Sequence, residues 1–412
     1  MRHDRESRSP KRSMQDYLQM GRTLADNHLR TQRSQYKHQP KLSPFREYLS
    51  TVVWGWLFYY LKSRFGFKAD YKSYNEASNG VFEIGPEPGQ DRIVLGVAGD
   101  WATDTVEAVK IADCIKSLDP DITIHIGDTY FVGAPPEIKS NFLGEHPLWH
   151  HGKNGSLALL GNHEMYAQGT SYFRDLLPVL KVRDRSGTLY KQQAAYFCLE
   201  TDHWRILGLD TGYNSIGIPG LELTGWFPPS CRFPKKMMDW LSKINFSDDK
   251  GTLIFTHHQY ITAFDEQEYI KPAQQLSALL GEDREIIWIW GHEHKFAAYH
   301  KVKVKDGVTA FGRCIGHGGT PVEIKSSKFQ KKKSNYGYNR LMLVDDRLRT
   351  TLDGVELGYN GFAKIEIEGE ALTISYRDCE RELLNETWFN LAGGKLKVTV
   401  NCVLDGLKMH AE

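Results

Sequence analysis

The 412-residue sequence is short of cysteine and of net charge, and each shortage excludes a class of protein. Its six cysteines are scattered without a CxxC pair, which argues for a reduced interior and against a disulfide framework. The formal net charge is +1, so no overall field points to nucleic acid as a partner. The sequence also lacks an internal repeat, a G-x-G-x-x-G dinucleotide fingerprint and, in its polar first 48 residues, the apolar run of a secretory signal. We therefore expect a cytoplasmic protein.

The remaining composition is typical of a soluble globular protein, with 41% hydrophobic and 25% charged residues. Charge is unevenly distributed, because residues 1–47 carry 11 Lys/Arg and 5 Asp/Glu, whereas the rest of the chain carries 41 and 46. A basic arm of this kind either meets an anionic surface or is a solvated tail. We expect a basic arm at 1–48, an aromatic helix and linker at 49–90, a catalytic core at 91–320 and a C-terminal β-rich extension packed on the core at 321–412.

Residues 49–61 are strongly apolar and aromatic, and basic residues flank them. As a helix they would span about 20 Å, which is too short for a bilayer. Their tryptophans and tyrosines favour an interfacial helix, and with it a peripheral membrane contact through residues 1–68. The alternative is a helix packed on the catalytic body or on a second subunit, and the oligomeric state stays open.

After residue 90, apolar runs typical of strands alternate with helical patterns. Residues 91–99 and 121–126 read as buried strands on either side of a helix that ends near Ser117, so we expect a β–α–β unit with parallel strands. Polar motifs follow five of the predicted strands, and such strand ends meet at one edge of an α/β sheet. The motifs are Gly99-Asp100-Trp101-Ala102, Gly127-Asp128-Thr129-Tyr130, Gly161-Asn162-His163-Glu164, Thr256-His257-His258 and Gly291-His292-Glu293-His294.

The chemistry of these motifs points to metal ions. They supply carboxylate and amide oxygens and imidazole nitrogens, without a thiolate, and this donor set suits Mn, Fe or Zn. One carboxylate can bridge two cations about 3.5–4 Å apart, the separation used in two-metal phosphate chemistry. The candidate ligands are Asp100, Asp128, Asn162, His257, His292 and His294.

This motif series resembles that of the calcineurin-like metallophosphoesterases, over about residues 91–320. The resemblance implies an α/β fold, a four-layer α/β/β/α sandwich of two mixed sheets, here with a C-terminal β extension, and two divalent or trivalent metal ions. It assigns the first metal to Asp100, Asp128 and His294. It assigns the second to Asp128, Asn162, His257 and His292, with Asp128 bridging. His258 stays the alternative to His257.

The resemblance also assigns a catalytic role to His163, which would face the scissile phosphate and be oriented by a carboxylate. The first motif departs from the usual Asp-x-His, because Ala102 stands where the histidine is expected, as in the purple acid phosphatase branch. That branch has a tyrosine three residues after the second aspartate, whereas this chain has Phe131 there and Tyr130 one residue early. We therefore expect the first metal to be completed by water or by a residue not yet identified.

The function implied is hydrolysis of a phosphate ester, either a monoester or a diester, by metal-bound hydroxide that attacks phosphorus. Its partner would be the phosphate-ester substrate, and no specific nucleic acid is expected. The alternative is a non-catalytic scaffold with the same fold, which a loss of ligands would favour. A nuclease is a weaker alternative, because basic residues near the site are few.

Overall fold

The computed structural model describes residues 67–75, 78–143, 148–216, 230–281, 283–350, 356–407 and 409–410. The predicted arm at 1–48 and the aromatic segment at 49–61 lie outside these residues. Within the described ranges, no helix has the length and apolar character needed to cross a membrane. The peripheral membrane contact through residues 1–68 therefore stays a prediction.

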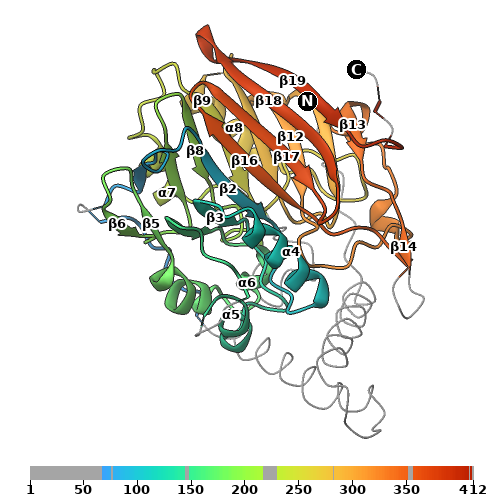
Figure 1. Cartoon of the computed structure of the whole chain (residues 1–412), viewed down its shortest axis with the longest axis horizontal. Coiled ribbons are helices and arrows are strands. Elements are labelled where there is room, and N and C mark those ends of the chain that lie inside the picture. The colour runs from blue at the N-terminus through green and yellow to red at the C-terminus, as the bar shows by residue number, and fades with distance from the viewer. Residues whose placement is uncertain are drawn as a thin grey trace, which may run out of the picture.

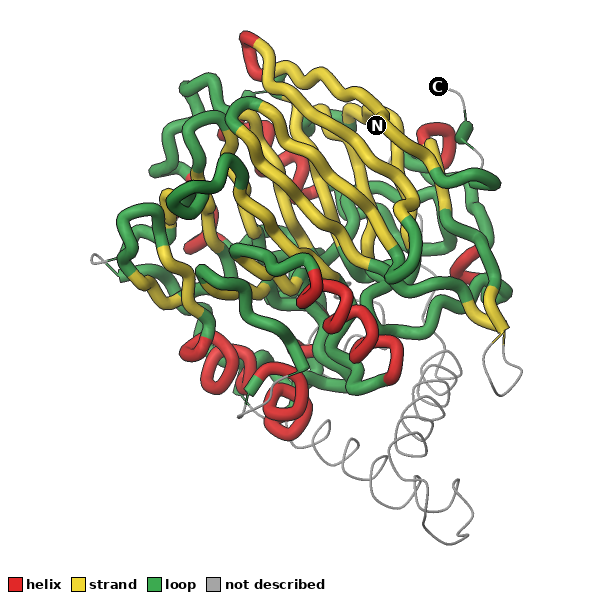
Figure 2. The backbone as a smooth tube through the Cα atoms, in the orientation of Figure 1, coloured by secondary structure: helices red, strands yellow, loops and turns green. Residues whose placement is uncertain are grey.

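Two mixed sheets form the centre of the molecule, and the helices and most loops lie outside them (Figures 1 and 2). The eight-stranded sheet has the order β1 (Val81–Glu83), β7 (Phe197–Glu200), β8 (Trp204–Gly208), β9 (Gly251–Thr256), β10 (Glu285–Trp290), β12 (Thr309–Ile315), β11 (Phe296–Lys303), β13 (Leu341–Val344). The nine-stranded sheet has the order β19 (Lys395–Val403), β18 (Glu382–Leu391), β17 (Ala371–Arg377), β16 (Phe362–Glu368), β2 (Ile93–Ala98), β3 (Ile122–His125), β4 (Gly155–Ala158), β5 (Lys181–Arg183), β6 (Leu189–Lys191).

The described α-helices are short and connect or cover the strands. They are α4 (Val106–Ser117), α5 (Pro135–Phe142), α6 (Asn162–Met165), α7 (Lys235–Leu241) and α8 (Lys271–Leu280). Strands β2, β3 and β4 are parallel, and α4 connects β2 to β3, as the β–α–β prediction required. In the other sheet β8, β9, β10 and β12 are parallel as well. A small third sheet pairs β14 (Arg349–Thr350) with β15 (Glu356–Leu357).

The strands bury both faces, which explains their continuous apolar sequences. Along β10, Ile287 and Ile289 join the cluster packed between the two sheets. Trp288 and Trp290 point the other way and join the cluster that includes Leu276 of α8. This alternation follows from the two-residue period of a strand. The result is the predicted α/β sandwich of two mixed sheets.

The C-terminal strands extend the sheet that carries the first motifs. Strand β16 pairs antiparallel with β2, in the register Ala363 to Val97. In Figure 1, β16 to β19 continue the sheet from β2 across the front of the molecule. The side chains of Arg313 on β12 and Glu386 on β18 pair across the interior between the sheets.

One expectation from the sequence was wrong. Cys114 of α4 and Cys379, in the turn between β17 and β18, form a disulfide. The two residues are 265 positions apart, so their spacing carries no local signal. They meet because β16 pairs with β2 and the β16–β17 hairpin brings the turn after β17 back beside α4. The other four cysteines are free.

Candidate metal centre

The six predicted ligands lie at the carboxyl ends of parallel strands. Asp100 follows β2, Asp128 follows β3, Asn162 follows β4, His257 follows β9, and His292 and His294 follow β10. All are buried except His294, whose side chain is 21% exposed and marks the open side of the centre. Strand ends from both sheets thus bring together the six candidate ligands.

Asp128 is the hub of this group. Its Oδ1 lies 3.2 Å from His257 Nε2 and accepts a hydrogen bond from the backbone N–H of His163 at 2.9 Å. His257 Nε2 also lies 3.1 Å from Asn162 Oδ1, while His257 Nδ1 faces the Ile126 carbonyl at 3.1 Å. One half of the centre therefore contains Asp128, Asn162 and His257 in direct contact.

The other half lies around Asp100. Its Oδ2 accepts a hydrogen bond from the backbone N–H of His292 at 2.6 Å, and its Oδ1 lies 3.5 Å from His294 Nε2. Atoms of Asp100, Asp128 and His257 that can bind metal all lie within 4.8 Å of one another. The two halves are therefore adjacent and share Asp128.

Tyr130 is a functional candidate that counting along the sequence did not find. Its hydroxyl lies 2.9 Å from Asp100 Oδ1, 3.1 Å from Asp128 Oδ2 and 2.9 Å from His294 Nε2. These are the three residues that the resemblance assigns to the first metal. The only signal in the sequence is that Tyr130 lies two residues after Asp128.

The two adjacent histidines have different surroundings. His257 faces Asp128 and Asn162, whereas His258 Nδ1 lies 3.1 Å from Thr211 Oγ1. The His258 ring lies near that of His292, with centroids 4.5 Å apart. Since the imidazole of His257 is the one in contact with Asp128, the geometry favours His257 over His258 as the partner of Asn162.

His163 follows Asn162 and packs against Tyr130, with ring centroids 4.1 Å apart. Its Nδ1 lies 2.7 Å from the Phe131 carbonyl oxygen, and its Nε2 lies 3.8 Å from Asp128 Oδ2. The group that orients Nδ1 is thus a backbone carbonyl, not the carboxylate that we expected. A carbonyl oxygen only accepts hydrogen bonds, so Nδ1 carries the proton and Nε2 faces the centre.

The backbone at three candidate ligands has an unusual conformation. Asp100, Asp128 and His292 have φ angles of 54°, 71° and 63°, in the left-handed region that few non-glycine residues adopt. Such strain persists only where the surrounding structure enforces it, and it concentrates at functional sites. Glycine is required at Gly291, where a Cβ would lie 2.5 Å from Asp100 Oδ2.

Burial and neighbouring charges shift the pKa values of the centre. Burial opposes ionisation of Asp128, but His257 and His163 outweigh it and hold the pKa of this carboxyl well below its ordinary value. Burial also opposes charging of His257, yet Asp128 raises the pKa of this imidazole to about 9. Burial dominates at Asp100, where it raises the pKa to about 7. Two buried carboxylates thus share one small site that a cation would stabilise.

The residues present fit a metal centre. The donors are carboxylate and amide oxygens and imidazole nitrogens, a set that suits Mn, Fe or Zn, and Asp128 presents Oδ1 to one half and Oδ2 to the other. Glu164 is placed as a support: its Oε2 accepts from the backbone N–H groups of Gly161 and Asp128 at 2.9 and 3.3 Å. It therefore fixes two of the loops that carry the donors.

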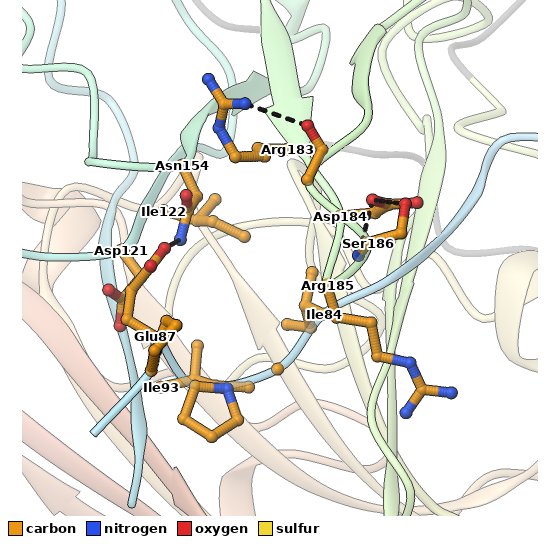
Figure 3. Close-up of a pocket in the computed structure, with 14 residues that line it drawn as sticks. Ile84, Glu87, Ile93, Asp121, Ile122, Asn154, Arg183, Asp184, Arg185 and Ser186 are labelled. Carbon is orange, nitrogen blue, oxygen red and sulfur yellow. Dashed lines mark hydrogen bonds between the residues drawn. The ribbon is translucent and has the colours of Figure 1, made fainter. Parts of the chain in front are cut away.

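A separate depression of about 260 Å³ lies at the opposite ends of these strands. Figure 3 shows Asp121, Glu87 and Asn154 on one side of it and Asp184 and Arg185 on the other. These polar groups are engaged with neighbouring side chains or backbone, for example Asn154 with Glu87 at 2.6 Å and Arg185 with Asp202 at 2.9 Å. The depression is therefore part of the loop structure, remote from the metal centre.

The fold and the centre together define an α/β protein of the two-sheet type whose aspartates and histidines could hold a metal ion. Residues 93–296 match the family model of the calcineurin-like phosphoesterases, which confirms for this region the resemblance seen in the motif series. No protein with curated annotation matches the chain.

Solved structures with a related arrangement are distant. GAP50, described as the anchor in the inner membrane complex of Plasmodium, is 14% identical over 71% of this chain and 86% of its own, with a TM-score of 0.41. The purple acid phosphatase PPD1 from yellow lupin (Lupinus luteus) is 12% identical over 71% and 53%, also with a TM-score of 0.41. A dimetal phosphatase from Danio rerio is 10% identical over 73% and 99%, with a TM-score of 0.39. At these values the likenesses carry no argument about activity.

Proposed function

We propose that this chain hydrolyses phosphate esters, monoesters or diesters, at a two-metal centre. The observation that carries the proposal is the position of Asp128. Its two carboxylate oxygens lie in contact with different sets of donors, His257 on one side and the Tyr130 hydroxyl on the other. A bridging carboxylate with a separate donor set for each ion is what two-metal phosphate chemistry requires.

In this proposal Asp100, Asp128 and His294 hold the first ion, and Asp128, Asn162, His257 and His292 hold the second. Bound ions would supply a water of lowered pKa and positive charge next to the phosphate oxygens. Asn162 contributes an uncharged oxygen, so it adds a ligand without adding negative charge. The buried walls of the centre strengthen every one of these electrostatic interactions.

We infer that Tyr130 completes the first metal site in place of the histidine absent at Ala102. The support is the contact of its hydroxyl with Asp100, Asp128 and His294 at 2.9–3.1 Å. Burial, together with the two carboxylates, keeps the pKa of this phenol well above its ordinary value. The hydroxyl is therefore a neutral donor and acceptor in the metal-free protein.

His163 handles the proton of the leaving group. Its Nδ1–H is held by the Phe131 carbonyl, which aims Nε2 toward the side of the centre where Asp128 Oδ2 lies. A proton on Nε2 is thus held near the phosphate, where it can pass to the leaving oxygen. General acids of this kind contribute about 10²–10⁴-fold to rate.

The test is hydrolysis of a chromogenic phosphate monoester and of the matching diester, with added Mn²⁺, Fe²⁺ or Zn²⁺. Asp128→Asn removes the bridging charge and His163→Ala removes the acid, so each should lower kcat by about 10²-fold or more. His203→Ala is the matched control, since His203 is exposed in the turn between β7 and β8.

Metal analysis separates the enzyme from the scaffold alternative. About two ions per chain, together with turnover that depends on Asp128, supports the hydrolase. A purified chain that holds no metal and turns over neither ester contradicts it. A wild-type kcat in Asp128→Asn would contradict the role of Asp128 as the bridging ligand, and a wild-type kcat in His163→Ala would contradict the role of His163 as the general acid.

A further inference from the structure

The loop between β3 and α5 holds the Phe131 carbonyl on which the orientation of His163 depends. A backbone carbonyl is a weaker fixed point than a carboxylate in a sheet, because a loop can move. Something must therefore hold residues 131–134 in place for Nε2 of His163 to stay aimed at the centre.

Glu137, in the first turn of α5, is the group that holds this loop. Its Oε1 accepts a hydrogen bond from the Phe131 N–H at 2.5 Å, and its Oε2 accepts from Val132 at 3.2 Å and Ala134 at 2.7 Å. Three backbone N–H groups thus converge on one carboxylate. Hydrogen bonds to an ionised acceptor are about twice as strong as neutral ones.

The loop that Glu137 holds is also closely packed against its neighbours. Gly133 has a φ of 64°, and a Cβ on it would lie 2.6 Å from Glu164 Cα. Val132 and Ala134 form a small buried cluster with Ala167, just after α6. The loop at residues 131–134 thus packs against α6 and the turn that follows it, and in this arrangement the Phe131 carbonyl contacts His163.

We propose that Glu137 is a positioning residue of the hydrolytic site, which acts by fixing the Phe131 carbonyl that orients His163. The inference rests on the proposed function, in which His163 is the acid. Glu137 should not affect metal binding, because contacts with Asp100, Asp128 and His294 already position the Tyr130 hydroxyl at the metal centre. Glu137→Gln should therefore affect turnover and leave metal content unchanged.

The decisive experiment is a double-mutant cycle in the full chain with metal added. Glu137→Gln keeps shape but replaces one acceptor oxygen by an NH₂ donor that faces N–H groups. It should lower kcat by about 10–100-fold, the range for partners that orient an active-site group, with little change in KM. In a His163→Ala background the same change should have almost no further effect, because the group it orients is gone. Ser140→Ala, on the exposed side of α5, is the control and should match the wild type.

A second readout does not depend on activity. In ¹⁵N NMR spectra of histidine-labelled protein, His163 should show a protonated, hydrogen-bonded Nδ1 in the wild type and a mixture of tautomers in Glu137→Gln. An unchanged His163 signal with wild-type kcat, or an equal loss in both backgrounds, overturns the role of Glu137. A wild type inactive on both esters whose His163 signal still responds to Glu137→Gln overturns the proposed function alone.

Discussion

Replacing Glu386 by Gln should destabilise the fold by about 3–5 kcal/mol, because it leaves a buried guanidinium without its counter-charge. Arg313 on β12 donates to both carboxylate oxygens of Glu386 on β18, Nε at 2.9 Å and Nη2 at 2.5 Å. The two side chains are 2% and 1% exposed. The pair therefore joins the two sheets in the interior of the sandwich.

The size of the effect follows from the surroundings of Arg313. Its Nη1 donates to the carbonyls of Tyr299 and Gly312, both at 2.7 Å, and its guanidinium lies near the Trp388 ring, so it cannot turn to solvent. An unfolding entropy of about 2.1 cal/mol/K per residue gives about 0.7 kcal/mol/K for the roughly 320 residues that the structure describes. The loss therefore corresponds to a fall in Tm of about 4–7 °C.

Calorimetry and urea unfolding of Glu386→Gln measure this directly. The matched control is Arg185→Met, which breaks exposed pairs with Glu83 and Asp202 and should lose less than about 1 kcal/mol. Replacing both buried charges, as Arg313→Met with Glu386→Leu, should recover most of the loss, because neither charge is then left alone. A Tm of Glu386→Gln within about 1 °C of the wild type would refute the reasoning, as would a double variant less stable than Glu386→Gln.

Three further perturbations test the centre and its frame. Tyr130→Phe should lower the affinity for the first metal by about 10–100-fold and reduce the metal content from about two ions per chain toward one. Tyr190→Phe is the control and should keep the wild-type metal content. Equal metal content in the two variants would exclude Tyr130 as a ligand. Burial holds the pKa of His125 at about 3 in the folded chain, against about 6.5 unfolded. As the pH falls below about 6.5, only the unfolded chain takes up this proton, so the folded state loses stability. Between pH 7 and pH 5, the free energy of unfolding of the wild type, measured in urea, should therefore fall by about 2 kcal/mol more than that of His125→Phe. Equal losses in the two proteins would contradict this. Cys379→Ser opens the link to Cys114 and should lower the free energy of unfolding by up to about 5 kcal/mol, and reductant should then affect only the wild type; a variant as stable as the wild type would contradict this.

The parallel strands and their motif-bearing ends could be predicted because their signals are local. Residues 93–98 are a continuous apolar run, whereas residues 122–125 alternate isoleucine with Thr123 and His125; both fit a short strand buried on both faces. Each ends within four residues of an aspartate, so the convergence of Asp100 and Asp128 follows from the sheet alone. No knowledge of distant contacts was needed for either.

Strand β18 was not predicted, because its signal depends on a distant partner. The residues of β18 that face the interior include Glu386 as well as Leu384 and Trp388. In the sequence, a glutamate at such a position predicts exposure to solvent, so the alternation typical of a half-buried strand is lost. Glu386 can be buried only because Arg313, 73 residues earlier, supplies the opposite charge. The same limit applies to the disulfide of Cys114, whose partner is 265 positions away.

Tyr130 shows why counting residues fails inside the site itself. Spacing from Asp128 would place the residue three positions on at the metal, which is Phe131. The backbone places Tyr130 there instead. Thr129 forms a parallel bridge with Ala102, and the Tyr130 N–H donates to the Ala102 carbonyl at 2.9 Å. The motifs at 99–102 and 127–130 thus run side by side, and this places the Tyr130 hydroxyl next to Asp100. Ala102 and the early tyrosine therefore belong to one packing arrangement, because the pairing of Ala102 with Thr129 and Tyr130 is what brings the Tyr130 hydroxyl to the centre.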